Sequence, residues 1–191
     1  MTGRLKSKRI ILGVTGSIAC YKAVELASLL VKEEAKVDVI LTHSAQNFIK
    51  PLSFSSLTHS KVFTDLWDEE PESGTTHIDL ADQADLVLLA PATAHILAQM
   101  AHGLAGDLLT SLLLATRAHI LVAPAMNGNM WLHEATKQNV SVLKDRGVSF
   151  IEPESGQLAC GYEGVGRLAN VDAIFQHVLN ILTQNQTNEV I

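Results

Sequence analysis

The apolar positions of the chain form short continuous runs that alternate with longer, periodic segments. Continuous runs bounded by turn residues are typical of parallel strands buried on both faces, whereas apolar residues repeating every three to four positions predict helices. We expect strands at 9–15, 37–42, 85–90, 120–123 and 148–151, and helices at 18–34, 94–105, 108–115, 132–146 and 171–182. This alternation predicts a doubly wound α/β fold with a largely parallel sheet, a three-layer domain of the flavodoxin or Rossmann type.

Composition limits the classes of protein that this sequence can encode. With 191 residues and 47% hydrophobic content, the chain has enough apolar residues for one domain at 1–182, followed by a polar tail at 183–191. A net charge of −6 provides no positive field for a nucleic acid or an anionic membrane, and no apolar run is long enough to cross a bilayer. The two cysteines, Cys20 and Cys160, are far apart and suggest no disulfide framework, so we expect a reducing, cytoplasmic setting.

The most informative motif directly follows the apolar run at 118–123. It reads Pro124-Ala125-Met126-Asn127, with Met130-Trp131 close behind. Open α/β sheets bind ligands at the carboxyl ends of their strands, which is where this motif falls. Met130 and Trp131 alone are equally compatible with packing beneath a helix, but Asn127 favours a ligand site.

A glycine-containing turn at 13–19 follows the first predicted strand and opens onto a helix. Such a turn exposes backbone N–H groups to an anion, although a purely structural turn fits the same residues. The pattern lacks the third glycine of the dinucleotide fingerprint, and the second strand ends in Thr42-His43-Ser44 without an acidic residue for a ribose. The combination indicates a mononucleotide and argues against an NAD-dependent dehydrogenase.

Motifs at successive strand ends resemble one known family over about residues 8–168. They are Gly16-Ser17-Ile18-Ala19, Pro91-Ala92-Thr93-Ala94, the Pro124 motif already described, and Leu158-Ala159-Cys160-Gly161 followed by Gly164-Val165-Gly166-Arg167. Their types and order are similar to those of the homo-oligomeric flavin-containing cysteine decarboxylases.

The resemblance implies that FMN is the cofactor and assigns roles to individual positions, with no metal site. The FMN phosphate would be bound by Gly16, Ser17, Ile18, Thr42 and Ser44, and the isoalloxazine ring by Pro91, Ala92, Thr93, Ala94 and Ala125. The substrate would be bound by Ala125, Met126, Asn127 and Met130, with its carboxylate on Asn127. His77 matches the catalytic histidine of the family, and Cys160 matches a proton donor. Cys20, on a predicted helix, is interpreted as a buried packing residue.

The implied chemistry is decarboxylation of a cysteine-derived carboxylate. Oxidation of the thiol to a thioaldehyde supplies the electron sink that loss of CO2 requires, and FMN carries this redox step. Cys160 would supply a proton when the ene-thiolate is reduced, which favours 4′-phosphopantothenoylcysteine as substrate and 4′-phosphopantetheine, an intermediate of coenzyme A biosynthesis, as product. A peptidyl-cysteine oxidative decarboxylase would share His77 and Asn127 but would not need Cys160.

Two other interpretations remain as alternatives outside this chemistry. A flavin prenyltransferase would have no use for Asn127, and a non-enzymatic flavin-binding regulatory subunit would carry a long acidic tail. The resemblance also implies a trimer, or a dodecamer built from trimers, and a phosphopantothenate-cysteine ligase as a separate or fused partner. Two positions depart from the family pattern, because His95 stands where asparagine is frequent and Tyr162-Glu163 where aspartate is frequent. The roles of His95 and Tyr162 are left open.

Overall fold

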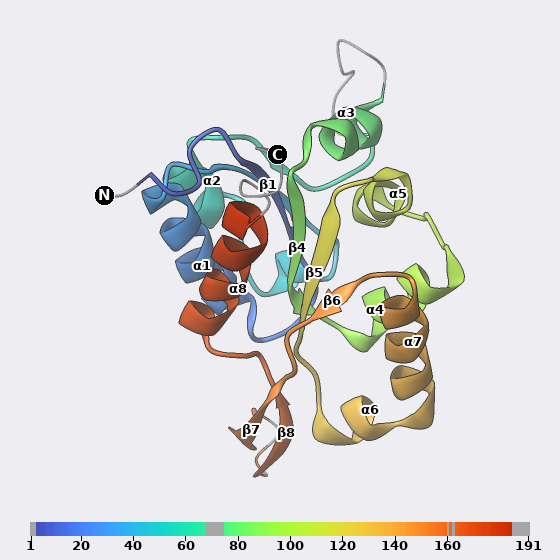
Figure 1. Cartoon of the computed structure of the whole chain (residues 1–191). Coiled ribbons are helices and arrows are strands. Elements are labelled where there is room, and N and C mark those ends of the chain that lie inside the picture. The colour runs from blue at the N-terminus through green and yellow to red at the C-terminus, as the bar shows by residue number, and fades with distance from the viewer. Residues whose placement is uncertain (1–2, 68–74, 160, 162, 185–191) are drawn as a thin grey trace.

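The computed structural model describes residues 3–67, 75–159, 161 and 163–184 (Figure 1). Its centre is a six-stranded parallel sheet with the strand order β3-β2-β1-β4-β5-β6. The strands are β1 (Arg9–Val14), β2 (Lys36–Leu41), β3 (Val62–Phe63), β4 (Leu86–Ala92), β5 (His119–Pro124) and β6 (Ser149–Phe150). The predicted doubly wound, parallel architecture is confirmed.

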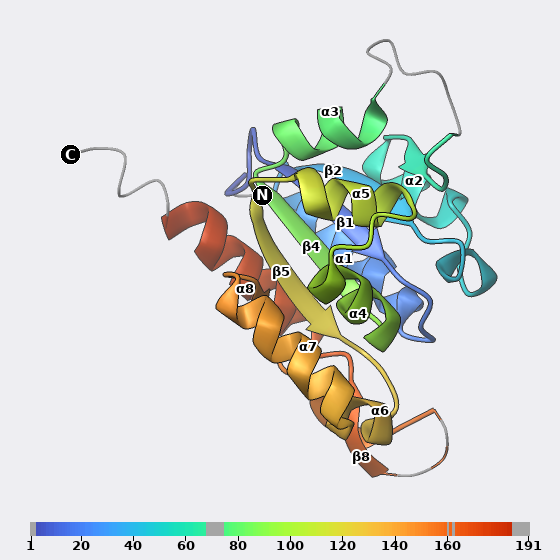
Figure 2. The same cartoon turned by 90° about the vertical axis from the view of Figure 1, so that its right-hand side faces the viewer.

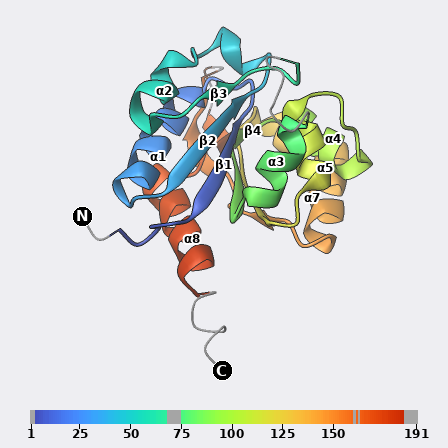
Figure 3. The same ribbon diagram turned by 90° about the horizontal axis from the view of Figure 1, so that it is seen from above.

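Helices cover both faces of this sheet, as the view from above shows (Figure 3). One layer contains α1 (Cys20–Lys32), α2 (Leu52–Thr58) and α8 (Val171–Gln184), and the other contains α3 (Thr76–Gln83), α4 (Ala94–His102), α5 (Leu108–Ala115) and α7 (Glu134–Asp145). Successive residues of the central strands pack on opposite faces of the sheet. Leu12 belongs to the core beneath the first helix layer, and Ile11 belongs to the core beneath the second. This two-sided burial explains why the strands read as continuous apolar runs. No described helix is long and apolar enough to cross a membrane.

The structure differs from the predicted elements at several short segments. The helix expected at 132–146 is two helices, α6 (Gly128–Leu132) and α7, because His133 adopts an extended backbone between them and its Nδ1 accepts a hydrogen bond from the Ala135 N–H at 3.1 Å. The brief elements α2, β3, α3 and the 3₁₀ turn η1 (Ala45–Asn47) had not been expected. Helix α8 continues to Gln184, two residues past its expected end.

A separate antiparallel hairpin follows β6. Its strands are β7 (Glu154–Gln157) and β8 (Glu163–Arg167), and it lies beside α6 beyond the carboxyl ends of the sheet strands (Figure 2). A hairpin in this glycine-containing region was not predicted from the sequence. In the structure it is a paired, regular element that leads directly into the last helix.

Candidate active site

A buried threonine joins the loops that follow β1 and β4. Thr15 is 2% exposed; its hydroxyl donates a hydrogen bond to the Pro91 carbonyl at 2.8 Å and accepts one from the Thr93 N–H at 3.0 Å. The Thr15 N–H also donates to the Pro91 carbonyl, at 3.2 Å. The two loops predicted to bind the flavin are therefore held as one surface. Sequence reasoning did not single out Thr15, which looks like any other residue of the turn.

The turn after β1 presents unpaired donors. Within the described residues, neither the Gly16 nor the Ile18 N–H has an acceptor, and the Ser44 hydroxyl has no hydrogen-bond partner. Gly16 is required by close approach, because a Cβ at this position would lie 2.5 Å from the Cβ of Ser44. Two backbone donors and a hydroxyl gathered ahead of α1 suit the oxygens of a phosphate group. The residues present thus fit the phosphate of FMN.

A cavity of about 410 Å³, here called the loop cavity, opens beside these donors. Its predicted lining residues are Gly16, Thr42, Ser44, Thr93 and Met130; the structure adds Thr15, His43, His95, Ile96, Gln99 and Asp107. Asp107 also caps α5, accepting a hydrogen bond from the Thr110 N–H at 2.8 Å, a signal that the Asp-Leu-Leu-Thr sequence contains. Pro91 and Ala92 are buried next to this cavity at the end of β4, and Ala94 begins α4.

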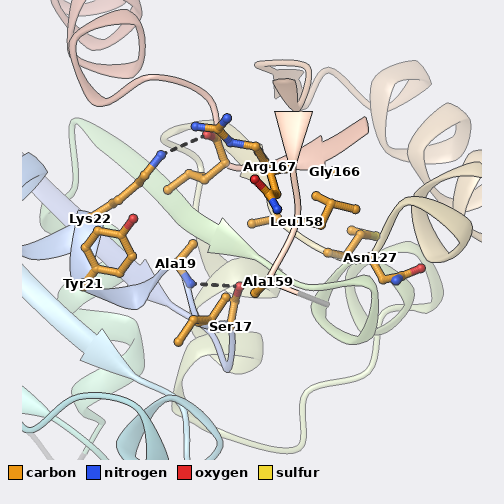
Figure 4. Close-up of a pocket in the computed structure, with 14 residues that line it drawn as sticks. Ser17, Ala19, Tyr21, Lys22, Asn127, Leu158, Ala159, Gly166 and Arg167 are labelled. Carbon is orange, nitrogen blue, oxygen red and sulfur yellow. Dashed lines mark hydrogen bonds between the residues drawn. The ribbon is translucent and has the colours of Figure 1, made fainter. Parts of the chain in front are cut away.

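A second cavity of about 500 Å³, the hairpin cavity, lies between the start of α1 and the β7–β8 hairpin (Figure 4). Its predicted lining residues are Ser17, Ile18, Ala125, Met126 and Asn127. The structure adds Ala19, Tyr21, Lys22, Gln157, Leu158, Ala159, Gly166, Arg167 and Leu168. The predicted phosphate-binding turn therefore borders both cavities, since Gly16 faces one and Ser17 the other. The substrate motif lies across the hairpin cavity from α1.

The hairpin is docked directly on the substrate motif. The Met126 N–H donates a hydrogen bond to the Gly166 carbonyl at 3.0 Å, and a Cβ on Gly128 would lie 2.8 Å from the Val165 carbonyl. Asn127 Oδ1 accepts a hydrogen bond from the Asn129 N–H at 2.9 Å, which caps α6 and fixes the amide. A bound carboxylate needs a donor, and Nδ2 is the donor end of this side chain.

His77 is not brought to these cavities within one chain. It lies in the first turn of α3, which precedes the amino end of β4, whereas Asn127 follows the carboxyl end of β5. The strands are parallel, and the seven residues of β4 span about 20 Å at the usual rise per residue. Figure 1 places α3 and α6 at opposite ends of the sheet.

Only one of the two cysteines, Cys20, lies among the described residues. Cys20 is fully buried on α1, and its Sγ donates a hydrogen bond to the Thr15 carbonyl at 3.2 Å. Burial raises the pKa of the Cys20 thiol, so this group stays protonated at neutral pH and serves packing. Cys160 and Tyr162 lie outside the described residues, as do 68–74 and 185–191. In the sequence, Cys160 directly follows Ala159, which lines the hairpin cavity.

Comparisons with known proteins agree on one family. A family profile described as Flavoprotein matches residues 1–183. The coenzyme A biosynthesis bifunctional protein CoaBC of Bacillus subtilis is 48% identical over 170 residues, which are 89% of this chain and 42% of that protein. The chain therefore spans less than half the length of this curated relative.

Solved structures with the same fold also cover nearly the whole chain. A PPC decarboxylase variant complexed with pantothenoylaminoethenethiol superposes with a TM-score of 0.81 at 30% identity, covering 90% of this chain and 96% of that one. The FMN-dependent cysteine decarboxylase SpaF has a TM-score of 0.77 at 28% identity, covering 91% of this chain and 99% of that one.

Proposed function

The chain belongs to the flavoprotein family, and on that premise we propose that it decarboxylates 4′-phosphopantothenoylcysteine to 4′-phosphopantetheine with FMN as cofactor. The observation that carries this proposal is the pair of cavities sharing one turn. The donors of Gly16, Ile18 and Ser44 suit the cofactor phosphate, and the cavity on the other side of that turn contains Asn127 for the substrate.

When bound, FMN would supply the redox chemistry, both the oxidation at the carbon that bears sulfur and the reduction that follows loss of CO2. The protein's own residues bind the substrate, orient it and protonate the ene-thiolate. The Asn127 amide can hold the carboxylate with a neutral donor, which does not oppose the loss of its negative charge as a fixed cation would. The hairpin, held to Met126 by the hydrogen bond to the Gly166 carbonyl, forms one wall of this part of the cavity. Cys160 is proposed to protonate the ene-thiolate during the final reduction.

The distance between His77 and Asn127 supports a site shared between subunits. If His77 is the acid–base residue, a second copy of the chain must bring its own α3 to the cavities. Ile18, Tyr21 and Met130 border the cavities and are 59%, 65% and 48% exposed, so these apolar side chains are available for coverage by a partner. We therefore propose a homo-oligomer built from trimers, with each site completed by a neighbouring subunit.

The second part of the proposal concerns the enzyme that makes the substrate. A relative of this chain is a bifunctional coenzyme A biosynthesis protein in which the matching region is less than half of the whole. A ligase that joins phosphopantothenate to cysteine supplies the substrate, either as a separate protein or as a fused domain, in the cytoplasm.

Substrate preference tests this function directly. Purified protein should contain FMN and should convert 4′-phosphopantothenoylcysteine to a product that has lost only CO2, as mass spectrometry will show. A peptide ending in cysteine should react far more slowly. Loss of CO2 together with two hydrogens from the peptide, with no reaction of the pantothenoyl compound, would replace this proposal with peptidyl-cysteine decarboxylation.

A further inference from the structure

Two cations lie at the end of the hairpin cavity that is opposite Asn127. Lys22 comes from the first turn of α1, and Arg167 is the last residue of β8 (Figure 4). They are the only charged residues among the cavity's described lining residues, so no carboxylate faces them from its walls. Neither has a role in the chemistry of decarboxylation proposed above.

Neither cation has an ion-pair partner in the described part of the chain. Arg4, Arg9 and Lys144 each lie within 2.7 Å of a carboxylate oxygen, whereas Lys22 contacts only the Leu168 carbonyl, at 3.4 Å. Lys22 is half-buried and Arg167 is exposed, so both cations are available to a ligand that carries negative charge.

The acidic residue opposite Arg167 in the hairpin already accepts a hydrogen bond. Glu154 is paired with Arg167 in the β7–β8 register, but its Oε1 accepts a hydrogen bond from the Asn170 N–H at 2.8 Å. The carboxylate therefore stabilises the turn that leads into α8 and leaves the guanidinium without a carboxylate partner among the described residues.

The hairpin also makes room for the arginine. The Arg167 side chain lies across Gly156 of the neighbouring strand, where any Cβ would collide with Nη1 and would lie 3.1 Å from Cδ. Gly156 adopts a φ of +150°, which other residues rarely adopt. Packing of this kind restricts the guanidinium before any ligand arrives, which lowers the entropic cost of binding.

We propose that Lys22 and Arg167 form a subsite for a phosphomonoester, the 4′-phosphate of the substrate. This inference rests on the proposed function. Arginine offers a planar pair of donors that matches two phosphate oxygens, and lysine adds a compact positive charge. A substrate with a carboxylate at one end and a phosphate dianion at the other matches a cavity with Asn127 at one end and two cations at the other. The subsite then selects phosphorylated substrates over dephosphorylated ones and over peptides.

Product binding tests this subsite without turnover. Calorimetric titration of the FMN-loaded protein with 4′-phosphopantetheine and with pantetheine gives a ratio of dissociation constants. We expect the native protein to prefer the phosphorylated ligand, and Arg167→Gln to lower that preference about ten- to hundredfold, the usual effect of losing a hydrogen bond to a charged group. The double variant Lys22→Gln with Arg167→Gln should bring the ratio close to one, and Arg167→Lys should retain part of it. Arg117→Gln and Lys36→Gln, at exposed positions outside the cavity, should keep the native ratio.

The outcomes separate the two sources of a phosphate group. If the double variant loses FMN, the cations hold the cofactor's phosphate and the proposal is overturned. It is also overturned if the native protein binds both ligands equally, or if the double variant retains the native ratio. Failure of the proposed function is distinguishable: the native protein would then prefer the phosphorylated ligand without decarboxylating its cysteine precursor.

Discussion

Substitution of Gly16 by alanine should weaken FMN binding through a single steric contact. The new Cβ would lie 2.5 Å from Ser44 Cβ and 3.1 Å from the Ser44 carbonyl carbon, whereas carbon atoms prefer about 3.5–4.0 Å. Gly16 does not have a positive φ, so alanine introduces no backbone strain of its own. The turn after β1 must therefore move away from Ser44 by about 1 Å, the difference between these distances.

The expected magnitude follows from this displacement. Forcing one extra carbon into a packed contact costs about 1–3 kcal/mol. The free protein can relax by separating the turn from Ser44. Bound FMN needs the donors of the turn and the Ser44 hydroxyl together, so the cost appears as a dissociation constant for FMN that is raised about 5- to 150-fold. Titration of the deflavinated protein with FMN, followed by quenching of flavin fluorescence, measures it.

Two further variants test whether the contact with Ser44 causes the weaker binding of FMN. Gly106→Ala places its Cβ in open space, also without a positive φ, and should bind FMN as the native protein does. Ser44→Gly removes both the closest atom and a phosphate-binding hydroxyl, so adding Gly16→Ala to that variant should lower its FMN affinity less than Gly16→Ala lowers the affinity of the native protein. Native affinity in Gly16→Ala would refute the reasoning, because the donors of this turn could then not be the phosphate site.

The remaining predictions concern the proposed catalytic groups. His77→Asn should retain FMN but lose thiol oxidation by about a hundredfold or more, as for a displaced acid–base group, and near-native turnover would remove His77 from the mechanism. Mixed oligomers of the inactive variants His77→Asn and Asn127→Asp should regain activity, because some sites would combine native residues from two subunits; mixtures as inactive as their components would contradict a shared site. Cys160→Ser, with a much less acidic group in place of the thiol, should still decarboxylate but accumulate an ene-thiol product two hydrogens lighter than 4′-phosphopantetheine; saturated product at the native rate would show that Cys160 is not the donor.

The fold could be predicted from the sequence because its central strands are buried on both faces. The continuous run at 86–92 leaves no polar face, and α1 and α8 show clear periodicity, so these elements were located to within a few residues. The short elements could not be located in the same way. Strand β3 has two residues and α2 has seven, too few for a period to repeat, and contacts with β2 and α1 stabilise them.

The candidate site was predictable where chemistry depends on a local motif. Gly16, Ser44 and Asn127 stand at strand ends, which parallel topology brings to one edge of the sheet. Lys22 and Arg167 were missed because they are far apart in sequence and become neighbours only when the hairpin docks beside α1. The separation of His77 from Asn127 was not predicted, although the same topology implies it: His77 precedes β4 and Asn127 follows β5, so they lie at opposite ends of a parallel sheet.

The central claim is that decarboxylation proceeds without net oxidation of the substrate, and an anaerobic experiment tests it most directly. The flavin absorbance of the native protein is followed during turnover of 4′-phosphopantothenoylcysteine, and the product is then identified by mass. We expect the absorbance of oxidised flavin to return in full as many equivalents of saturated 4′-phosphopantetheine form. Stoichiometric bleaching of the flavin, with one equivalent of an ene-thiol and no further reaction, would contradict the account.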